Sequence, residues 1–545
     1  MPKLTIDGKE IEVPPGTTVI QAAEKLGIFV PRYCYHPGLS IAGNCRICLV
    51  EVEKAPKLQI ACNTPCADGM VVRTQTPKVE QGRESVLEFL LINHPLDCPV
   101  CDQSGECDLQ NFYMQYGLYD ARFQEQKVKK AKAFPLGPTV MLDAERCVLC
   151  SRCTRFTDEI TKTGELGIFN RGDKAEVGLY PGRELNNNYS GNVVDICPVG
   201  ALTDKDFRFK ARVWYLSSAP SVCTGCSQGC NIDLHYVTDR PHLADGARVM
   251  RVKPRYNSDV NQWWMCDEGR YGYKFIDKDR ILKVRQKGRE TSWDQALSEL
   301  ARALSRAKSE GKQGQVGVLP SAQQTNEELY LVRKLFKESL GIGHCDIQVP
   351  RQPGSSDSFL IKGDKNPNTL GATLIGFPGA SAPAKPGNGA SASGVIIEKA
   401  LAGEIKTLWV FGHDLVKLIG KEKAKSLADK LELFVFQGPN ENGTAAYAHW
   451  VLPSAVFAEN NGTFVNCHGR IQRILPAFAP LGDARPDWKT LLDLFQLLEV
   501  PVSFKSPEDI FVKLAAENPA FEGLSHDKIG LQGAPVKTGV EVAAR

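Results

Sequence analysis

Cysteine is the residue type with the most informative spacing in this 545-residue chain, because 15 of its 18 cysteines fall into four groups before residue 270. Cysteines in a Cys-x2-Cys pair are poorly placed to form a disulfide, and thiolates are strong ligands for iron and zinc. The groups therefore predict metal centres. They are Cys34, Cys45, Cys48 and Cys62; Cys98, Cys101 and Cys107; Cys147, Cys150, Cys153 and Cys197; and Cys223, Cys226, Cys230 and Cys266.

The first group has the order C-x10-C-x2-C-x13-C, from Cys34 to Cys62. Plant-type ferredoxins use this order with a shorter first gap and bind a [2Fe–2S] cluster through four thiolates. The first group therefore predicts a [2Fe–2S] centre. Cys66 lies close by in the sequence, and we expect it to be a small buried thiol without a ligand role.

The second group has only three cysteines, which leaves one iron of a four-iron cubane without a thiolate. His94 precedes Cys98 by four residues, and imidazole is an accepted substitute for thiolate at iron–sulfur sites. We therefore predict a [4Fe–4S] cluster on His94, Cys98, Cys101 and Cys107.

The third group is a C-x2-C-x2-C triplet closed by the distant Cys197-Pro198 pair, as in half of a bacterial ferredoxin motif. In two-cluster ferredoxins the Cys-Pro cysteine binds the other cluster. Because no second triplet of this spacing is present, we predict that Cys197 completes the same [4Fe–4S] cluster as Cys147, Cys150 and Cys153.

The fourth group, C-x2-C-x3-C-x35-C, allows two interpretations. Four thiolates can hold a structural zinc ion, but this triplet spacing is commoner in cubanes. We predict a third [4Fe–4S] cluster on Cys223, Cys226, Cys230 and Cys266, with zinc as the alternative. Four clusters in one chain are expected to pass electrons along it.

The elements that must position these groups predict a multidomain α+β and α/β protein. An Asp-Gly turn between two alternating stretches within residues 4–13 predicts a hairpin, and Thr18 with Gln21 predicts a helix start. A helix is also expected before His94, with the apolar residues Val86, Leu87, Phe89, Leu90, Leu91 and Ile92 buried. We predict five domains, at residues 1–78, 79–118, 119–216, 217–273 and 274–545.

After Cys266 the pattern changes to alternating strands and helices, typical of a parallel sheet covered by helices. The expected strands are 315–319, 408–411 and 433–436, and an amphipathic helix is expected over 325–340. Residues 376–394 are rich in Gly, Ala, Pro and Ser, which favours a surface loop or linker. No glycine-rich phosphate motif follows any strand, so we expect the electrons to come from a partner.

Composition excludes several classes of protein. A net charge of +3 is too balanced for nucleic-acid binding, and the basic run 127–132 is expected to be a solvated surface. No stretch reaches the ~18–20 consecutive apolar residues of a membrane span. The chain moves directly into a strand-like pattern after Met1, so we expect no signal peptide and a cytoplasmic protein.

The ordered cysteine groups, together with the string HPLDCPVCDQSGEC at residues 94–107, resemble the large iron–sulfur subunit of respiratory complex I. Residues 217–545 resemble a molybdopterin oxidoreductase scaffold, notably in ENNGTFVN at 459–466. The resemblance implies a β-grasp ferredoxin domain at the N-terminus, one [2Fe–2S] cluster and three [4Fe–4S] clusters. It also implies an NADH- and FMN-binding partner that supplies electrons, and ferredoxin-like and other peripheral-arm partners that receive them. The chain would lie on the cytoplasmic side of a bacterial membrane, linked to the membrane arm only through these partners.

Two departures from molybdoenzymes lead us to expect no molybdopterin and no catalytic residues in this chain. The tail looks shortened, and it offers no convincing molybdenum ligand; Cys345 is expected to be a core thiol. The alternative functions are the large subunit of an NAD-linked molybdenum formate dehydrogenase, an iron-only hydrogenase and a structural zinc protein. The hydrogenase would need a further cysteine set in the tail, where only Cys345 and Cys467 occur.

Overall fold

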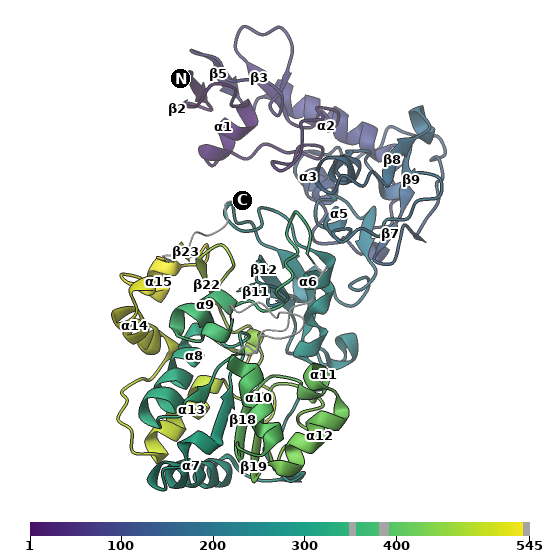
Figure 1. The fold of residues 1–545 in the computed structure, drawn as a ribbon. Helices are drawn as coiled ribbons and strands as arrows, with labels where there is room; N and C mark the ends of the chain where they lie inside the picture. The colour runs from purple at the N-terminus through teal and green to yellow at the C-terminus, as the bar shows by residue number, and fades with distance from the viewer. Residues whose placement is uncertain (348–355, 381–391, 538–545) are drawn as a thin grey trace. The chain divides into compact units, whose positions relative to one another are not determined.

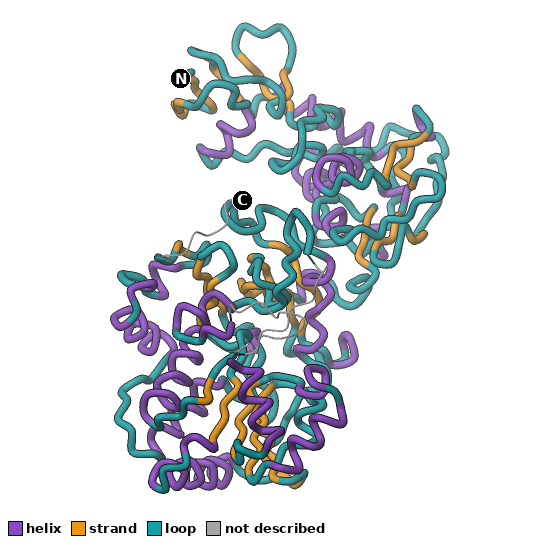
Figure 2. Tube along the Cα trace, viewed as in Figure 1, coloured by secondary structure: helices purple, strands orange, loops and turns teal. Residues whose placement is uncertain are grey.

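The computed structural model describes residues 1–347, 356–380 and 392–537 (Figures 1 and 2). The chain divides into two compact units, Met1–Leu216 and Ser217–Arg545. Both mix helices with sheets, as predicted. The finer division into five domains stays a prediction.

Unit 1 begins with a five-stranded sheet of order β2-β1-β5-β3-β4 beside helix α1 (Val19–Lys25). The predicted hairpin is confirmed, since β1 and β2 pair antiparallel, and Asp7 and Gly8 between them have φ values of 47° and 81°. The predicted helix start is confirmed as well, because the Thr18 N–H donates to Gln21 Oε1 at 2.9 Å. The strands are β1 (Lys3–Ile6), β2 (Lys9–Glu12), β3 (Leu49–Val52), β4 (Gln59–Ile60) and β5 (Val71–Arg73).

Helix α2 (Pro77–Leu91) precedes His94, as predicted, but one residue of its predicted buried set is misplaced. The buried side chains are Val79, Arg83 and Leu87, which are spaced four residues apart on one face. Phe89 lies two residues beyond Leu87, hence on the opposite face, and is 75% exposed. The prediction that Phe89 is buried is therefore wrong, and the other predicted apolar residues around it are half-buried apart from Leu87.

The rest of unit 1 consists of short elements that surround the second and third cysteine groups. A three-stranded sheet has the order β10-β7-β6, and β8 pairs with β9. Helix α4 continues without a break into a π-helical turn, Phe156–Ile160. The elements are α3 (Asp108–Tyr116), β6 (Phe134–Pro135), β7 (Val140–Leu142), α4 (Arg152–Arg155), β8 (Leu166–Phe169), β9 (Glu176–Leu179), α5 (Asn192–Asp195) and β10 (Leu202–Asp204).

The basic run 127–132 is not simply a solvated surface. Lys127 Nζ donates to the carbonyls of Leu91 and Ile92, at 2.8 Å each, at the end of α2. Lys132 Nζ lies 2.8 Å from Asp97 and 2.9 Å from Glu145. The run of like charges does not indicate these partners, because they lie on other elements. The lysines thus connect the segment around His94 to the start of the third group.

Unit 2 begins with a three-stranded antiparallel sheet, β11-β12-β13, which carries the fourth cysteine group together with α6. A second three-stranded sheet, β21-β22-β23, follows later in the chain. The bounds are β11 (Ser217–Val222), β12 (Asn231–Tyr236), β13 (Val249–Pro254), α6 (Asp267–Tyr271), β21 (Gly462–Val465), β22 (Arg470–Ile474) and β23 (Ala534–Pro535).

The largest sheet of unit 2 has seven strands among the described residues, in the order β15-β14-β20-β19-β18-β16-β17. The five strands from β20 to β17 are parallel, which confirms the predicted parallel sheet. Alternate residues of β18 face opposite sides: Trp409 packs in one buried cluster and Leu408 in another. The strands are β14 (Arg285–Gln286), β15 (Arg289–Glu290), β16 (Val316–Leu319), β17 (His344–Cys345), β18 (Thr407–Phe411), β19 (Leu433–Gly438) and β20 (Trp450–Pro453).

Helices cover both faces of this sheet (Figure 1). The face of Trp409 is covered by α7, α8, α9, α13 and α14, and the face of Leu408 by α10 and α12. The helices of this part of the chain are α7 (Trp293–Ser309), α8 (Asn326–Val332), α9 (Thr369–Ile375), α10 (Ala392–Ala402), α11 (Leu415–Ile419), α12 (Lys421–Lys430), α13 (Asp487–Leu497), α14 (Pro507–Glu517) and α15 (His526–Ile529).

The helix predicted over 325–340 is confirmed in position, but it is not amphipathic as predicted. Thr325 caps α8, and its hydroxyl accepts from the Glu328 N–H at 3.3 Å. A π-helical stretch, Arg333–Ser339, then completes the segment. All residues of α8 are buried, so the helix is not amphipathic; neighbouring helices α9, α13 and α14 and strand β21 enclose it.

Two further sequence predictions meet the structure only in part. Of the expected loop 376–394, residues 381–391 lie outside the described residues, Pro378–Ala380 form a 3-10 turn, and 392–394 belong to α10.

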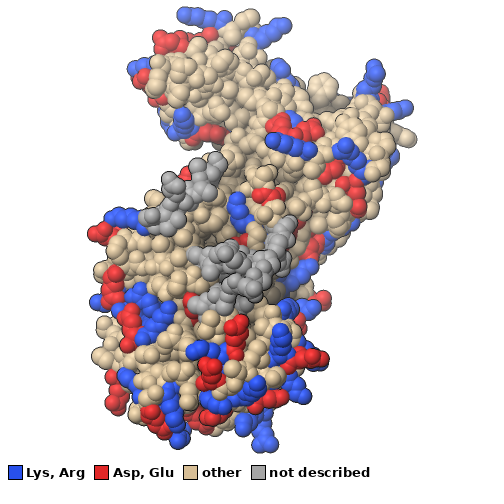
Figure 3. Space-filling model, viewed as in Figure 1, with Lys and Arg blue, Asp and Glu red and all other residues tan. Residues whose placement is uncertain are grey.

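No helix in the described part of the chain is long and apolar enough to cross a membrane. On the face shown in Figure 3, lysine and arginine side chains are interspersed with aspartate and glutamate over unit 2.

Candidate metal centres

The structure brings the four cysteines of the first group together. Cys34 follows α1, Cys48 directly precedes β3 and Cys62 follows β4, so the sheet fixes the distance between the loops. The Cys34 N–H donates to Cys45 Sγ at 3.4 Å, and the thiols of Cys34 and Cys48 both contact that of Cys62. Cys66 is buried, as expected.

The second group lies where a 3-10 turn, Cys98–Val100, leads towards α3. Cys101 interacts electrostatically with Cys98 and with Cys107, which directly precedes α3. Gly200 packs against this group so closely that a Cβ atom there would lie 2.3 Å from Cys101 Sγ. The segment after Cys197 therefore requires glycine at this position.

His94 lies beside Asp97 and Arg146, and the charge of the same arginine acts on Cys101. Burial lowers the pKa of His94 to about 4, so its imidazole is neutral at pH 7. A neutral imidazole has a free lone pair on one ring nitrogen, which a metal ligand needs. The structure thus places His94 in the same neighbourhood as the second group, in the protonation state that ligation requires.

The third group surrounds a cavity. All four cysteines line it, together with Leu142, Val177 and Leu202 among other residues, and it has about 350 Å³ of empty space, part of it open to solvent. Leu149 and Ser151 adopt left-handed backbone conformations, with φ values of 51° and 59°, which turn the loop around the cavity. Burial raises the pKa of both Cys147 and Cys197 to about 12.

The fourth group also surrounds a cavity, which all four of its cysteines line and which has about 340 Å³ of empty space, part of it open to solvent. Main-chain N–H groups point at the sulfur atoms: Gly225 donates to Cys223 Sγ at 3.5 Å, and Gly269 to Cys266 Sγ at 3.3 Å. A Cβ atom on Gly269 would lie 2.9 Å from Cys223 Sγ, so glycine permits this close approach.

These donor sets fit iron–sulfur clusters. Burial raises the pKa of most of these thiols, so several thiolates in one cavity require a compensating positive charge, which iron supplies. N–H donors to sulfur are the contacts that tune such clusters. In the described part of the chain, no group of three or more His, Cys, Asp or Glu side chains is arranged around a single ion.

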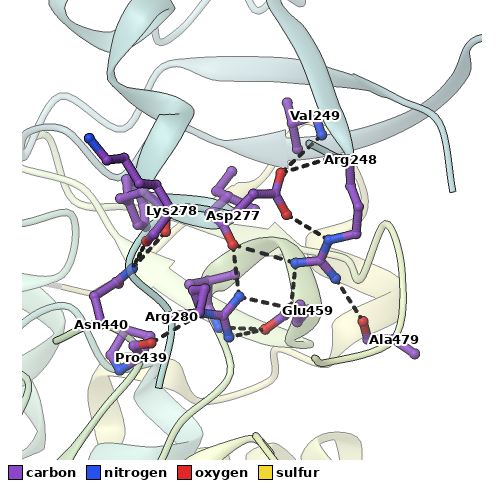
Figure 4. Close-up of polar contacts among 12 residues, drawn as sticks. Arg248, Val249, Asp277, Lys278, Arg280, Pro439, Asn440, Glu459 and Ala479 are labelled. Carbon is purple, nitrogen blue, oxygen red and sulfur yellow. Dashed lines mark hydrogen bonds and ion pairs between the residues drawn. The ribbon is translucent and has the colours of Figure 1, made fainter. Parts of the chain in front are cut away.

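A buried charge network connects the start of β13 to the segment that follows β19 of the large sheet (Figure 4). Glu459 accepts from Arg280 at 2.8 and 3.0 Å and from Arg248 at 2.7 Å. Arg248 precedes β13 and also pairs with Asp277 at 2.7 Å, whereas Arg280 donates to the Pro439 carbonyl beyond β19. The side chain of Glu459 has no exposed surface. This network therefore holds β13 and the parallel sheet together.

A further cavity lies at the carboxyl ends of the parallel strands, with about 1280 Å³ of empty space, part of it open to solvent. Ser321, Gly412, Gly438 and Ser454, which follow or end β16, β18, β19 and β20, line it together with Cys223. Ligands commonly bind at such an edge. Its charged lining among the described residues is acidic, with the carboxyl groups of Glu268, Glu328 and Asp487.

The lining of this strand-end cavity does not fit a pterin dinucleotide. The pyrophosphate of that cofactor carries negative charge, which arginine and lysine side chains neutralise. No lysine or arginine occurs among the described residues that line the cavity. Cys345 is buried in β17 within the core of the sheet, as expected of a core thiol, and does not line the cavity.

The acidic floor of this cavity predicts a pH-dependent stability. Burial and the nearby Asp487 raise the pKa of Glu328 from 4.5 to about 7, and burial raises that of Asp487. Between pH 4.5 and about 7 the folded chain holds a proton that the unfolded chain has lost, so the free energy of unfolding falls as the pH rises. Urea unfolding of the whole chain at several pH values should show this fall. Glu328→Gln should flatten it, and an unchanged slope in that variant would contradict the assignment.

Sequence reasoning missed several residues that hold these sites. Gly200 and Gly269 make room for sulfur atoms, and Arg152 and Arg155 contact the main chain of two cysteine groups. The glycines had a visible signal, since each lies three residues after a predicted ligand, Cys197 or Cys266. The arginines had none, because the carbonyl groups that they contact in the first cysteine loop lie more than 100 residues away in the sequence.

Models of known families match most of the chain in consecutive segments. Residues 2–77 match a 2Fe-2S iron-sulfur cluster binding domain, and 83–122 match the NADH-ubiquinone oxidoreductase-G iron-sulfur binding region. Residues 137–203 match the ferredoxin-like domain of NADH-quinone oxidoreductase subunit 3. The Fe4S4 domain of molybdopterin oxidoreductase matches 216–278, and molybdopterin oxidoreductase matches 379–496.

Relatives match along almost the whole length. The G subunit of NADH-quinone oxidoreductase from Rickettsia bellii is 33% identical, over 96% of this chain and 90% of the relative. The 75 kDa subunit of NADH-ubiquinone oxidoreductase from Reclinomonas americana is 30% identical, over 95% of this chain and 91% of the relative. A solved NAD+-reducing [NiFe]-hydrogenase chain is 29% identical, covering 39% of this chain and 91% of its own, with a TM-score of 0.34. Because bacterial and mitochondrial-type relatives match almost the whole chain, the chain belongs to the family of the G, or 75 kDa, subunit of NADH-quinone oxidoreductase.

Proposed function

We propose that this chain carries electrons through four iron–sulfur clusters held by its four cysteine groups. As a member of the family named above, it is an iron–sulfur electron-relay subunit of NADH-quinone oxidoreductase. The observation that carries the cluster assignment is that the third and fourth groups each line one cavity with all four of their cysteines.

The proposed ligands follow the sequence prediction. A [2Fe–2S] cluster would be held by Cys34, Cys45, Cys48 and Cys62. Three [4Fe–4S] clusters would be held by His94, Cys98, Cys101 and Cys107; by Cys147, Cys150, Cys153 and Cys197; and by Cys223, Cys226, Cys230 and Cys266. The second set combines one histidine with three cysteines, and variants at His94 and Cys101 test it.

The clusters, when bound, supply one-electron chemistry. The residues around them exclude water and stabilise the charge that reduction adds. Buried apolar residues such as Leu142 and Val177 exclude water from the third cavity. Main-chain N–H groups, such as that of Gly269, donate to sulfur and stabilise the negative charge that reduction adds. Nothing in the described cavity beside Cys223 favours a pterin phosphate, so the molybdopterin-like domain is proposed to be a scaffold.

The remaining features of the proposal rest on the family. We propose that electrons enter from an NADH- and FMN-binding subunit and leave through ferredoxin-like and other peripheral-arm subunits. The site of action would be the cytoplasmic side of the membrane, with the membrane arm reached through these partners. We also propose the five domains predicted from the sequence, with a β-grasp fold in residues 1–78; the segmental family matches support a division of this kind.

Elemental analysis of the chain purified without oxygen tests the cluster count. We expect about 14 iron atoms per chain, the sum of one [2Fe–2S] and three [4Fe–4S] clusters, and no molybdenum. About ten would mean that one cubane group is empty or holds zinc. The formate dehydrogenase alternative, which the relatives do not favour, requires stoichiometric molybdenum. Such a result would make the cavity beside Cys223 an active site.

A further inference from the structure

Arg155, at the end of α4, contacts the main chain of two different cysteine groups. Its Nη2 donates to the carbonyl of Cys34 at 2.5 Å and to that of Cys150 at 3.3 Å. Its Nη1 donates to the carbonyl of Ser40, in the loop between Cys34 and Cys45. One guanidinium therefore lies between a ligand of the first group and a ligand of the third.

Arg152, one turn earlier on the same helix, repeats this pattern. Its Nη2 donates to the carbonyl of Tyr35 at 2.8 Å, and its Nη1 to the carbonyl of Ile196 at 2.9 Å. These carbonyls belong to the residues next to Cys34 and Cys197. Arg152 is buried, and its positive charge acts on Cys150 and Cys197.

Two further contacts join the same pair of loops. The Ser40 N–H donates to Glu159 at 2.8 Å, and Asn44 Nδ2 donates to the Leu149 carbonyl at 3.2 Å. The loop over residues 34–45 is thus attached to the segment 149–159 at several points. The thiols of Cys34 and Cys150 are close enough to interact electrostatically.

We infer that Arg152 and Arg155 are positioning residues that fix the first cysteine loop against the third and place positive charge beside both clusters. The inference rests on the proposed function, because it concerns the clusters that these groups would hold. Reduction adds one negative charge to a cluster, and a nearby cation stabilises the reduced form. Both arginines therefore raise the reduction potentials of the first and third clusters together. Arginine suits this role because its planar fork donates to several carbonyls at once.

Arg155 is the better residue to substitute, because it is half-buried whereas Arg152 is buried. Arg155→Gln removes the charge and the fork, and Arg155→Lys keeps the charge but loses the fork. Arg171→Gln, at an exposed position on the turn between β8 and β9, is the matched control, since it makes the same change of charge. Each full-length protein is measured for iron per chain, for the reduction potentials of both clusters by EPR-monitored titration, and for amide hydrogen exchange over 34–45.

We expect Arg155→Gln to retain its iron and to lower both potentials. A tenfold change in the ratio of oxidised to reduced cluster corresponds to about 59 mV for one electron, and a shift of this order is expected in both clusters. Arg155→Lys should give a smaller shift. Amide exchange over 34–45 should be faster in both variants, including after removal of iron, because the arginine–carbonyl contacts do not involve the metal.

The outcomes separate the inference from the proposed function. Wild-type protein without iron in the first or third group would contradict the proposed function itself. If the clusters are present, potentials and exchange like those of Arg171→Gln in both Arg155 variants would overturn the inference. A shift confined to one cluster would overturn the shared role. Loss of iron from Arg155→Gln alone, with fast exchange in the iron-free chain, would support the positioning role.

Discussion

Cys101→Ala is expected to remove one whole [4Fe–4S] cluster, so that iron per chain falls from about 14 to about ten. Cys101 is the central cysteine of the second group: it interacts with Cys98 and Cys107, and Gly200 packs directly against its sulfur. In the proposed ligand set histidine takes the place of one thiolate, so the loss of Cys101 would leave only two cysteines and His94 for the cubane. Iron analysis and the EPR spectrum of the reduced protein measure the result.

His94→Cys is the companion variant, and its expected result is different. A thiolate at this position can still bind iron, so iron per chain should stay near ~14. The added negative charge should lower the reduction potential of this cluster and alter its EPR signal. A spectrum identical to that of the wild-type protein in both variants would remove His94 and Cys101 from the ligand set. A change in Cys101→Ala alone would remove only His94.

The spacing of the cysteines predicted which residues gather, because each set contains a short Cys-x2-Cys motif that marks it in the sequence. The loops of the first, third and fourth groups each bring their cysteines together as the spacing indicated. Spacing does not reveal what surrounds a loop. Arg155 contacts Cys34 across 121 positions, and Gly200 reaches Cys101 across roughly as long a stretch of chain, so both depend on tertiary packing.

The same division between local and long-range information explains the errors in the fold. The apolar runs at 408–411 and 433–436 predicted buried parallel strands, since a sheet covered on both faces has no polar side, and they lie within the observed strands β18 and β19. Phe89 is apolar, which favours burial, but the face of α2 that carries Val79, Arg83 and Leu87 is the one that packs. On that face the buried Arg83 donates to the Leu49 carbonyl and lies over the ring of Tyr116. A hydrophobic pattern in the sequence does not indicate these contacts.

Glu459→Gln is expected to destabilise unit 2 by about 3–5 kcal/mol, the usual cost of removing one partner from a buried ion pair. The carboxylate of Glu459 accepts from both Arg248 and Arg280, whose side chains are 11% and 2% exposed. Glutamine has nearly the same shape but no charge, so two buried guanidinium groups lose their shared counter-ion. Its amide N–H group would also face N–H donors of Arg280. The loss should be measured by urea unfolding of the full chain.

Glu522→Gln is the matched control, because Glu522 pairs with Lys537 at 2.6 Å while both side chains are more than half exposed. Water screens such a pair, so this variant should unfold at nearly the same urea concentration as the wild-type protein. Glu459 connects β13 to the segment beyond β19, so Glu459→Gln should also weaken the support of the fourth cysteine group. Iron should then be released from that group at a lower urea concentration than in the wild-type protein. If Glu459→Gln and Glu522→Gln unfolded alike, the buried network would not be what holds β13 to the parallel sheet.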